Sequence, residues 1–136
     1  VEAQLAEEPP EKRQRRADEE ELPAEVRDHA APRFLRHLCD RARPTRPACW
    51  VCAWGSLGAF ALDVASGRVI FEAAHVPERV VDTLGAGDTF NAAYLHARLS
   101  GADAAGALRC ACAVAGCKVG QVGFGELTRA LPPELR

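Results

Sequence analysis

The chain has 136 residues, of which 17 are Lys or Arg and 19 are Asp or Glu, and apolar residue types make up 48% of it. This length and apolar fraction suit one domain with a core of its own. The net charge of −2 gives no electrostatic reason to expect a nucleic-acid partner or a charged membrane surface, and no apolar run approaches the roughly 20 residues of a membrane-spanning helix.

The N-terminal segment, residues 1–31, is expected to be a charged and disordered arm. Residues 1–28 hold 15 charged side chains, 10 of them acidic, and show no apolar periodicity, which is typical of a segment that cannot bury a core. A basic run from Lys12 to Arg16 also resembles a nuclear or nucleic-acid signal, but the flanking acidic residues neutralise it. The sequence contains no methionine and begins with Val1, so we expect a processed product or a fragment.

Residues 32–73 are expected to form a helix followed by three strands. The helix is predicted from about Pro32 to Ala42, because proline is tolerated in the first turn of a helix. A strand is predicted over residues 48–54. Two further strand-like runs, residues 59–64 and 68–73, are separated by a short turn that ends in Gly67, and this pattern indicates a β-hairpin.

Six cysteines invite a disulfide or metal-site interpretation. Cys49 and Cys52 form a C-x-x-C pair, but side chains three residues apart on a strand point to opposite faces. The later cysteines at 110, 112 and 117 fall within a helical pattern and do not form the second paired knuckle of a zinc site. We therefore expect buried free thiols that pack as small apolar residues, and a reducing compartment, namely the cytoplasm.

The C-terminal half is expected to be helical. One helix is predicted from Asp88 to Leu99 and a second from about Asp103 to Lys118, with Asp103 as its N-cap and Gly120 as its C-terminal stop. The last stretch, residues 123–136, is expected to hold a short helix.

The segment that holds the candidate catalytic and phosphate-binding residues is 80–93, VVDTLGAGDTFNAA. Glycines just before a helix allow a tight turn and a close approach to a ligand, and the free N–H groups of the first helical turn form a phosphate-binding site. Asp88 is unusual there, because a carboxylate repels phosphate. It fits a general base that takes a proton from an attacking hydroxyl, while the glycine amides stabilise the transferred phosphoryl group.

Two residues of this segment have simpler interpretations that the spacing leaves open. Asp88 could cap the helix, since Asp is a favoured N-cap. Asp82 could hydrogen-bond loop amides and shape the turn, or it could contact a nucleotide or an ion.

A family resemblance adds weight to the kinase interpretation. Residues 82–88, DTLGAGD, resemble the C-terminal signature of the ribokinase-like (PfkB) sugar kinases. Further pieces between residues 33 and 125 resemble the ketohexokinase type of that family in particular. They are RFLRHL (33–38), CAW (52–54), and the segments around residues 107–120 and 123–124. Residues 1–31 show little of this similarity.

The resemblance implies roles for individual residues. Asp88 matches the catalytic base, which also touches the sugar hydroxyl, and Gly85, Ala86 and Gly87 match the anion hole. The residues that match the ATP-binding site are Gly55, Ser56, Leu57, Gly58, Phe90 and Cys112. The ketohexokinase type has two acidic residues where this chain has Ser56 and Leu57. His75, Val76 and Pro77 match the opposite wall of the adenine pocket more loosely.

The resemblance also implies a fold and a reaction. We expect residues 32–136 to be the C-terminal half of a three-layer α/β sandwich, with the glycine-rich anion-hole helix but without the family's lid strands and sugar-binding residues. The expected activity is ATP-dependent phosphorylation of a ketose such as fructose, with magnesium and a monovalent cation such as potassium as cofactors. The family's homodimer uses the lid strands, so we do not expect that dimer from this chain.

Two alternatives remain open at this point. The glycine signature is shared across the family, so a ribokinase- or adenosine-kinase-like substrate is compatible with it. The chain could also be a non-catalytic, truncated nucleotide-binding module, because Asp88 has no sugar site beside it in this sequence.

Overall fold

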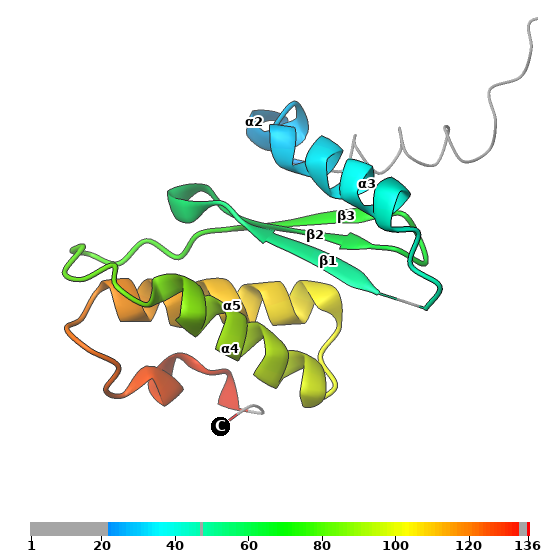
Figure 1. Cartoon of the computed structure of the whole chain (residues 1–136). Helices are drawn as coiled ribbons and strands as arrows, with labels where there is room; N and C mark the ends of the chain where they lie inside the picture. The colour runs from blue at the N-terminus through cyan, green and yellow to red at the C-terminus, as the bar shows by residue number, and fades with distance from the viewer. Residues whose placement is uncertain (1–21, 47, 134–135) are drawn as a thin grey trace, which may run out of the picture.

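The computed structural model describes residues 22–46, 48–133 and 136 (Figure 1). Two helices, α2 (Ala24–Arg27) and α3 (Ala30–Ala42), precede three strands, β1 (Cys49–Ala53), β2 (Gly58–Asp63) and β3 (Val69–Ala73). Helices α4 (Ala86–Leu99) and α5 (Ala104–Val119) follow. Short 3₁₀ helices, η1 (Gly55–Leu57) and η2 (Leu127–Ala130), lie between β1 and β2 and after α5.

The three strands form one antiparallel sheet in the order β1-β2-β3. The central strand is buried from Gly58 to Leu62, which is why its sequence is apolar at consecutive positions and does not alternate. The strand and hairpin predictions are confirmed, with β2 and β3 joined by the turn that ends in Gly67, whose φ is +73°. Gly67 adopts this left-handed conformation without the penalty that a side chain would bring.

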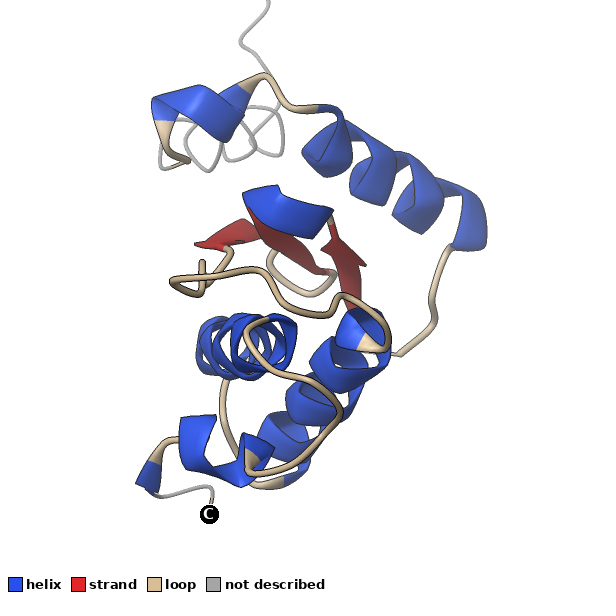
Figure 2. Cartoon of the chain, turned by 90° about the vertical axis from the view of Figure 1, so that its left-hand side faces the viewer, coloured by secondary structure: helices blue, strands red, loops and turns tan. Residues whose placement is uncertain are grey.

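Helices cover both faces of the sheet, so the molecule has three layers (Figures 1 and 2). Helices α4 and α5 pack together on one face, and α3 lies on the other. One apolar cluster fills the space between the sheet and the α4–α5 pair, around Phe90, Leu108 and Val114. A second cluster, around Leu35, Phe60 and Leu62, lies between the sheet and α3. The predicted three-layer α/β arrangement is therefore present.

The prediction of a disordered arm is wrong for residues 22–31. Leu22 is 4% exposed, and Val26 and Ala31 are fully buried in the α3-side cluster. These apolar side chains bury enough surface to order α2 and the start of α3, although acidic residues surround them in the sequence. The charged run from Lys12 to Arg16 lies outside the described residues.

Helix α3 begins two residues earlier than predicted, because the His29 ring caps it by accepting a hydrogen bond from the Ala31 N–H at 3.1 Å. The predicted cap of α5 is confirmed, since the Asp103 carboxylate accepts from the Gly106 N–H at 2.7 Å and Gly120 is the C-cap. All six cysteines are free thiols. Cys49 contacts the α4–α5 side and Cys52 the α3 side of the sheet, as their spacing predicts. No helix among the described residues is long and apolar enough to cross a membrane.

Candidate functional site

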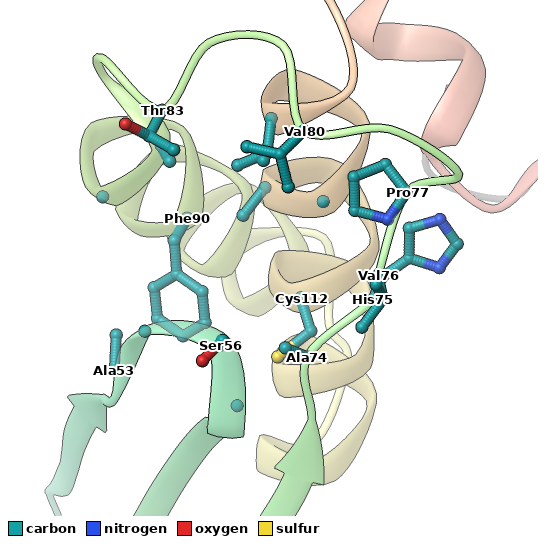
Figure 3. Close-up of a pocket in the computed structure, with 17 residues that line it drawn as sticks. Ala53, Ser56, Ala74, His75, Val76, Pro77, Val80, Thr83, Phe90 and Cys112 are labelled. Carbon is teal, nitrogen blue, oxygen red and sulfur yellow. The ribbon is translucent and has the colours of Figure 1, made fainter.

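A cavity of about 360 Å³ lies at one end of the sheet, between the β1–β2 turn, the loop after β3, and helices α4 and α5 (Figure 3). Ligand sites of small molecules have volumes of this order. Most of the wall is apolar or made of small residues. The lining residues are Ala53, Gly55, Ser56, Gly58, Ala74, His75, Val76, Pro77, Val80, Thr83, Ala86, Gly87, Phe90, Cys112, Ala115, Gly116 and Val119.

The first turn of α4 forms one wall of this cavity. Gly85 is the N-cap residue with φ +77°, and Ala86 and Gly87 line the cavity. A side chain at Gly85 would meet the Phe124 ring, because a Cβ there would lie 2.6 Å from Cζ. The N–H groups of a first helical turn lack intrahelical acceptors and carry the positive end of the helix dipole. This turn can therefore bind an anion at the edge of the cavity.

Asp88 is exposed and lies in the first turn of α4, three residues after the N-cap Gly85. The helix cap is thus Gly85, and the interpretation of Asp88 as the N-cap is wrong. Its side chain does not line the cavity. Instead it borders a shallower hollow on the outer side of the turn, together with His96, Phe124 and residues of η2. The glycine turn therefore borders the cavity on one side, and the carboxylate lies on the other.

Asp82 shapes the turn by hydrogen bonds at both carboxylate oxygens. Oδ1 accepts from the Leu84 N–H at 2.9 Å, and Oδ2 accepts from the Lys118 ammonium at 2.8 Å. These hydrogen bonds, with the one to Lys118 as the largest effect, hold the pKa of Asp82 below its ordinary value. Of the two roles left open for Asp82, the contact with a loop amide is present.

The β1–β2 turn contributes Gly55, Ser56 and Gly58 to the cavity. Leu57, predicted with them, is not among the lining residues. Its side chain packs against the α3-side cluster on the opposite face. Gly55–Leu57 form the 3₁₀ helix η1, which has about three residues per turn, so the neighbouring side chains of Ser56 and Leu57 point in different directions.

Phe90 and Cys112 lie on the inner wall and are 5% and 6% exposed. Burial, and to a smaller degree the charge of Glu72, raises the pKa of the Cys112 thiol to about 12. A thiol with this pKa stays protonated and unreactive near neutral pH. Both side chains therefore provide apolar surface suited to a flat ring. His75, Val76 and Pro77 lie on the cavity wall as the looser match predicts (Figure 3).

Several lining residues were not singled out as site residues from the sequence. On α5, Ala115, Gly116 and Val119 face the cavity with Cys112. Their spacing of three to four residues places them on one helix face, and this was the available signal. Gly116 is required by space, because a Cβ there would overlap the carbonyl of His75. Val80 and Thr83 come from an irregular loop, where no periodicity of the sequence indicates which side chains face the cavity.

Among the described residues, no group of three or more His, Cys, Asp or Glu side chains is placed to hold a metal ion. The cavity wall therefore offers apolar contacts and backbone N–H groups rather than a metal centre. This combination suits a ligand with a flat apolar part and an anionic part.

Comparisons with known proteins agree with this geometry. Residues 38–130 match the family described as pfkB family carbohydrate kinase. Mouse ketohexokinase is 47% identical over 90 residues, which are 66% of this chain and 29% of that protein. A solved structure of a Burkholderia thailandensis nucleoside kinase in complex with inosine superposes with a TM-score of 0.55 at 24% identity, over 70% of this chain and 33% of that one. The chain thus spans about a third of these relatives.

Proposed function

We propose that this chain, which belongs to the pfkB family of carbohydrate kinases, supplies the nucleotide site and the catalytic base for ATP-dependent phosphorylation of a ketose. The observation that carries the proposal is that an apolar cavity adjoins the glycine-led first turn of α4, with Asp88 on the other side of that turn. The identity of 47% with ketohexokinase over the same region supports a ketose as the acceptor.

The proposed binding mode of ATP follows from the residues that line the cavity. The adenine ring lies between Phe90, Cys112 and the loop that carries Val76 and Pro77. The phosphates extend toward the first turn of α4, whose N–H groups neutralise part of their charge. The small residues of the β1–β2 turn allow the backbone to approach the nucleotide closely.

In the proposed reaction, the Asp88 carboxylate accepts the proton of the acceptor hydroxyl as its oxygen attacks the γ-phosphorus of ATP. The bond between this phosphorus and the β–γ bridging oxygen breaks, and ADP leaves. The N–H groups of Gly85 and Gly87 stabilise negative charge on the phosphoryl group during the transfer, whereas the Ala86 N–H donates to the Thr83 carbonyl at 3.2 Å. Because Asp88 is exposed, the proposal requires further protein surface to hold the acceptor against it.

Magnesium belongs to this proposal as an ion carried by the nucleotide. Mg²⁺ in kinases is bound by substrate phosphates, waters and one or two carboxylates, so it does not need a dedicated cluster of protein ligands. The expectation that this chain does not form the family's lid-strand dimer and the expectation of a cytoplasmic location stay predictions.

Calorimetric titration of the 136-residue chain with ADP tests the nucleotide site. We expect saturable binding that Val80→Asp weakens about tenfold or more, because the new carboxylate lies in the cavity wall beside the phosphates. Val122→Asp is the matched control, since Val122 is 81% exposed and does not line the cavity. No binding by the unaltered chain, or an equal effect of both variants, would refute the site.

The acceptor is tested separately, in whichever form of the protein shows turnover. A panel of fructose, ribose and adenosine distinguishes the ketose from the ribokinase- or adenosine-kinase-like alternative. ADP binding by the 136-residue chain without phosphorylation of any of the three supports a nucleotide-binding module that needs the remaining protein.

A further inference from the structure

Lys118, near the end of α5, is a fully buried lysine with 0% exposure. Lysine is almost never fully buried unless its charge is paired. The burial of this ammonium therefore calls for an explanation from its partners.

The partners of Lys118 are all parts of the turn that precedes α4 or lie against it. Its Nζ donates to Asp82 Oδ2 at 2.8 Å and to the Asp82 carbonyl oxygen at 3.1 Å. The same ammonium lies 5.2 Å from the centre of the Phe124 ring, a distance at which a cation and an aromatic face attract each other. The Phe124 ring in turn occupies the space where Gly85 has no side chain.

Asp82, which is paired with Lys118, also forms hydrogen bonds with the backbone on both sides of the turn. Its Oδ1 accepts from the Leu84 N–H at 2.9 Å, and its own N–H donates to the Val119 carbonyl at 3.2 Å. The Leu84 side chain is 80% exposed, so packing of that side chain does not hold the residue in place. The turn is thus held from both sides by contacts that meet at one buried ammonium.

We propose that Lys118 is a positioning residue that holds the glycine turn before α4 in its anion-binding shape. The inference rests on the proposed function of that turn as a phosphate site. Lys118 does not bind the anion directly in this scheme, because Asp82 already neutralises its charge. It acts through Asp82 and Phe124 on the backbone of residues 82–85.

A role in global stability does not account for the pair equally well. The Lys118 side chain is fully buried while that of Asp82 is 31% exposed, and the cost of removing the ammonium from water offsets much of its attraction to a partly solvated carboxylate. The pair can instead improve anion binding by fixing the positions of the N–H donors in the turn. A misplaced N–H donor loses most of its attraction for the anion.

The first test is amide hydrogen exchange of the 136-residue chain without nucleotide. We expect Lys118→Met to raise the exchange rates of residues 82–88 about tenfold or more relative to those of β2 and β3. Arg109→Met is the matched control, because Arg109 is exposed on the same helix and does not line the cavity. Unchanged exchange of residues 82–88 in Lys118→Met would overturn the proposal.

A double variant tests whether Lys118 acts through Asp82. If it does, Asp82→Asn together with Lys118→Met exchanges no faster at residues 82–88 than Lys118→Met alone, because both changes remove the same restraint. Additive increases would mean that each residue stabilises the turn by itself, and this outcome contradicts the proposed route.

ADP titration then links the turn to the proposed function. We expect Lys118→Met to raise the Kd for ADP about tenfold, equivalent to about 1.4 kcal/mol, and Arg109→Met to leave it unchanged. If the unaltered chain does not bind ADP, the nucleotide-site proposal fails while the exchange data still decide the positioning of the turn. Loosened exchange with unchanged ADP affinity would overturn the positioning role in binding.

One measurement on the unaltered chain keeps the proposal testable if Lys118→Met does not fold. The Leu84 amide is expected to exchange much more slowly than an exposed loop amide, because it donates to Asp82 Oδ1. Exchange of Leu84 at the rate of an unprotected amide would show that the turn is not held.

Discussion

Two glycine turns border the same cavity, and they are held in different ways. The β1–β2 turn is enclosed by backbone, because Gly58 lies against the Glu72 carbonyl and 2.9 Å separates the place of its missing Cβ from Ala73 Cα. The turn before α4 is enclosed by side chains, since the missing Cβ of Gly85 faces the Phe124 ring. A neighbouring backbone cannot yield without breaking the sheet, whereas a ring can rotate or shift.

The two turns therefore differ in what determines their shape. The β1–β2 turn is part of the sheet, so its shape follows from the fold. The α4 turn is adjusted by the side chains of Lys118, Asp82 and Phe124, so its shape can be changed without unfolding the chain. Glycine substitutions and titration of Asp82 can test this distinction.

The largest effect on stability is expected from Gly58→Ala. The new Cβ would overlap the Glu72 carbonyl at a φ of +132°, and we expect a loss of about 3 kcal/mol or more in the free energy of unfolding. Gly55→Ala is the matched control in the same turn, with φ +56° and no atom within 4 Å, and a cost of about 1 kcal/mol. Urea denaturation measures both, and equal losses would contradict the role of the Glu72 backbone.

Gly85→Ala is expected to cost less, about 1–2 kcal/mol, from the strain at φ +77° and a displaced Phe124 ring. In a Phe124→Ala background the ring clash is absent, so only the strain should remain. A cost that stays the same in both backgrounds would show that Phe124 does not constrain the turn.

Gly87→Ala should have the opposite sign for stability. Gly87 lies inside α4 with no atom within 4 Å of a new Cβ, so alanine should stabilise the helix by about 0.5–1 kcal/mol. The added methyl group lies in the cavity wall, and we expect weaker ADP binding. Thermal denaturation and titration of the same sample measure the two effects, and tighter binding would contradict the placement of Gly87 at the phosphates.

Asp88→Asn is expected to strengthen phosphate binding by the isolated chain. The carboxylate lies in the first turn that binds the anion, and its removal relieves repulsion of about 0.3–1 kcal/mol, or roughly 2–5-fold in Kd. In a form of the protein with turnover, the same variant should lower kcat about 10²–10⁴-fold, because the base is lost. Tighter ADP binding with normal turnover would leave Asp88 as a neighbour of the site rather than its base.

The smallest expected effect is the loss of stability at acidic pH that is due to Asp82. The folded state lowers the pKa of Asp82 below the unfolded value of about 3.9. As the pH falls, Asp82 is therefore protonated in the unfolded chain before it is protonated in the folded chain. Its contribution to stability is present above about pH 4 and is lost as the pH falls from there through the pKa of Asp82 in the folded state. Lys118→Met should reduce this loss, as urea denaturation at pH 3–6 can measure. An identical pH dependence in the variant would contradict the ion pair as the cause.

Much of the fold could be predicted because local signals agreed with tertiary packing. The hairpin ending in Gly67 and the cap at Asp103 depend on neighbouring residues only, so the sequence contains all the information they need. The order in residues 22–31 was missed for the opposite reason. Val26 and Ala31 are buried in a cluster with Phe60 and Leu62 of β2, which are far from them in the sequence, and no local pattern indicates that surface.

The candidate site shows the same division. Glycine spacing and the family resemblance singled out Ala86, Gly87, Gly58, Phe90 and Cys112, which line one cavity. The sequence did not indicate that the Leu57 side chain packs on the α3 side, because the side of a turn that reaches the cavity depends on how the turn packs on the sheet. Lys118 gave no signal, since a lysine near a helix end is usually solvated.

Residue type and short-range spacing were enough to indicate the family, most of the helices and strands, and the glycine segment that precedes α4. The tertiary structure alone decided that Gly85 and not Asp88 caps α4, that Asp88 lies outside the cavity, and that a buried ammonium holds the turn. These features arise where α5, the loop after β3 and the segment around Phe124 meet. Contacts between residues more than 30 positions apart are set by packing and burial, and no periodicity along the chain encodes them.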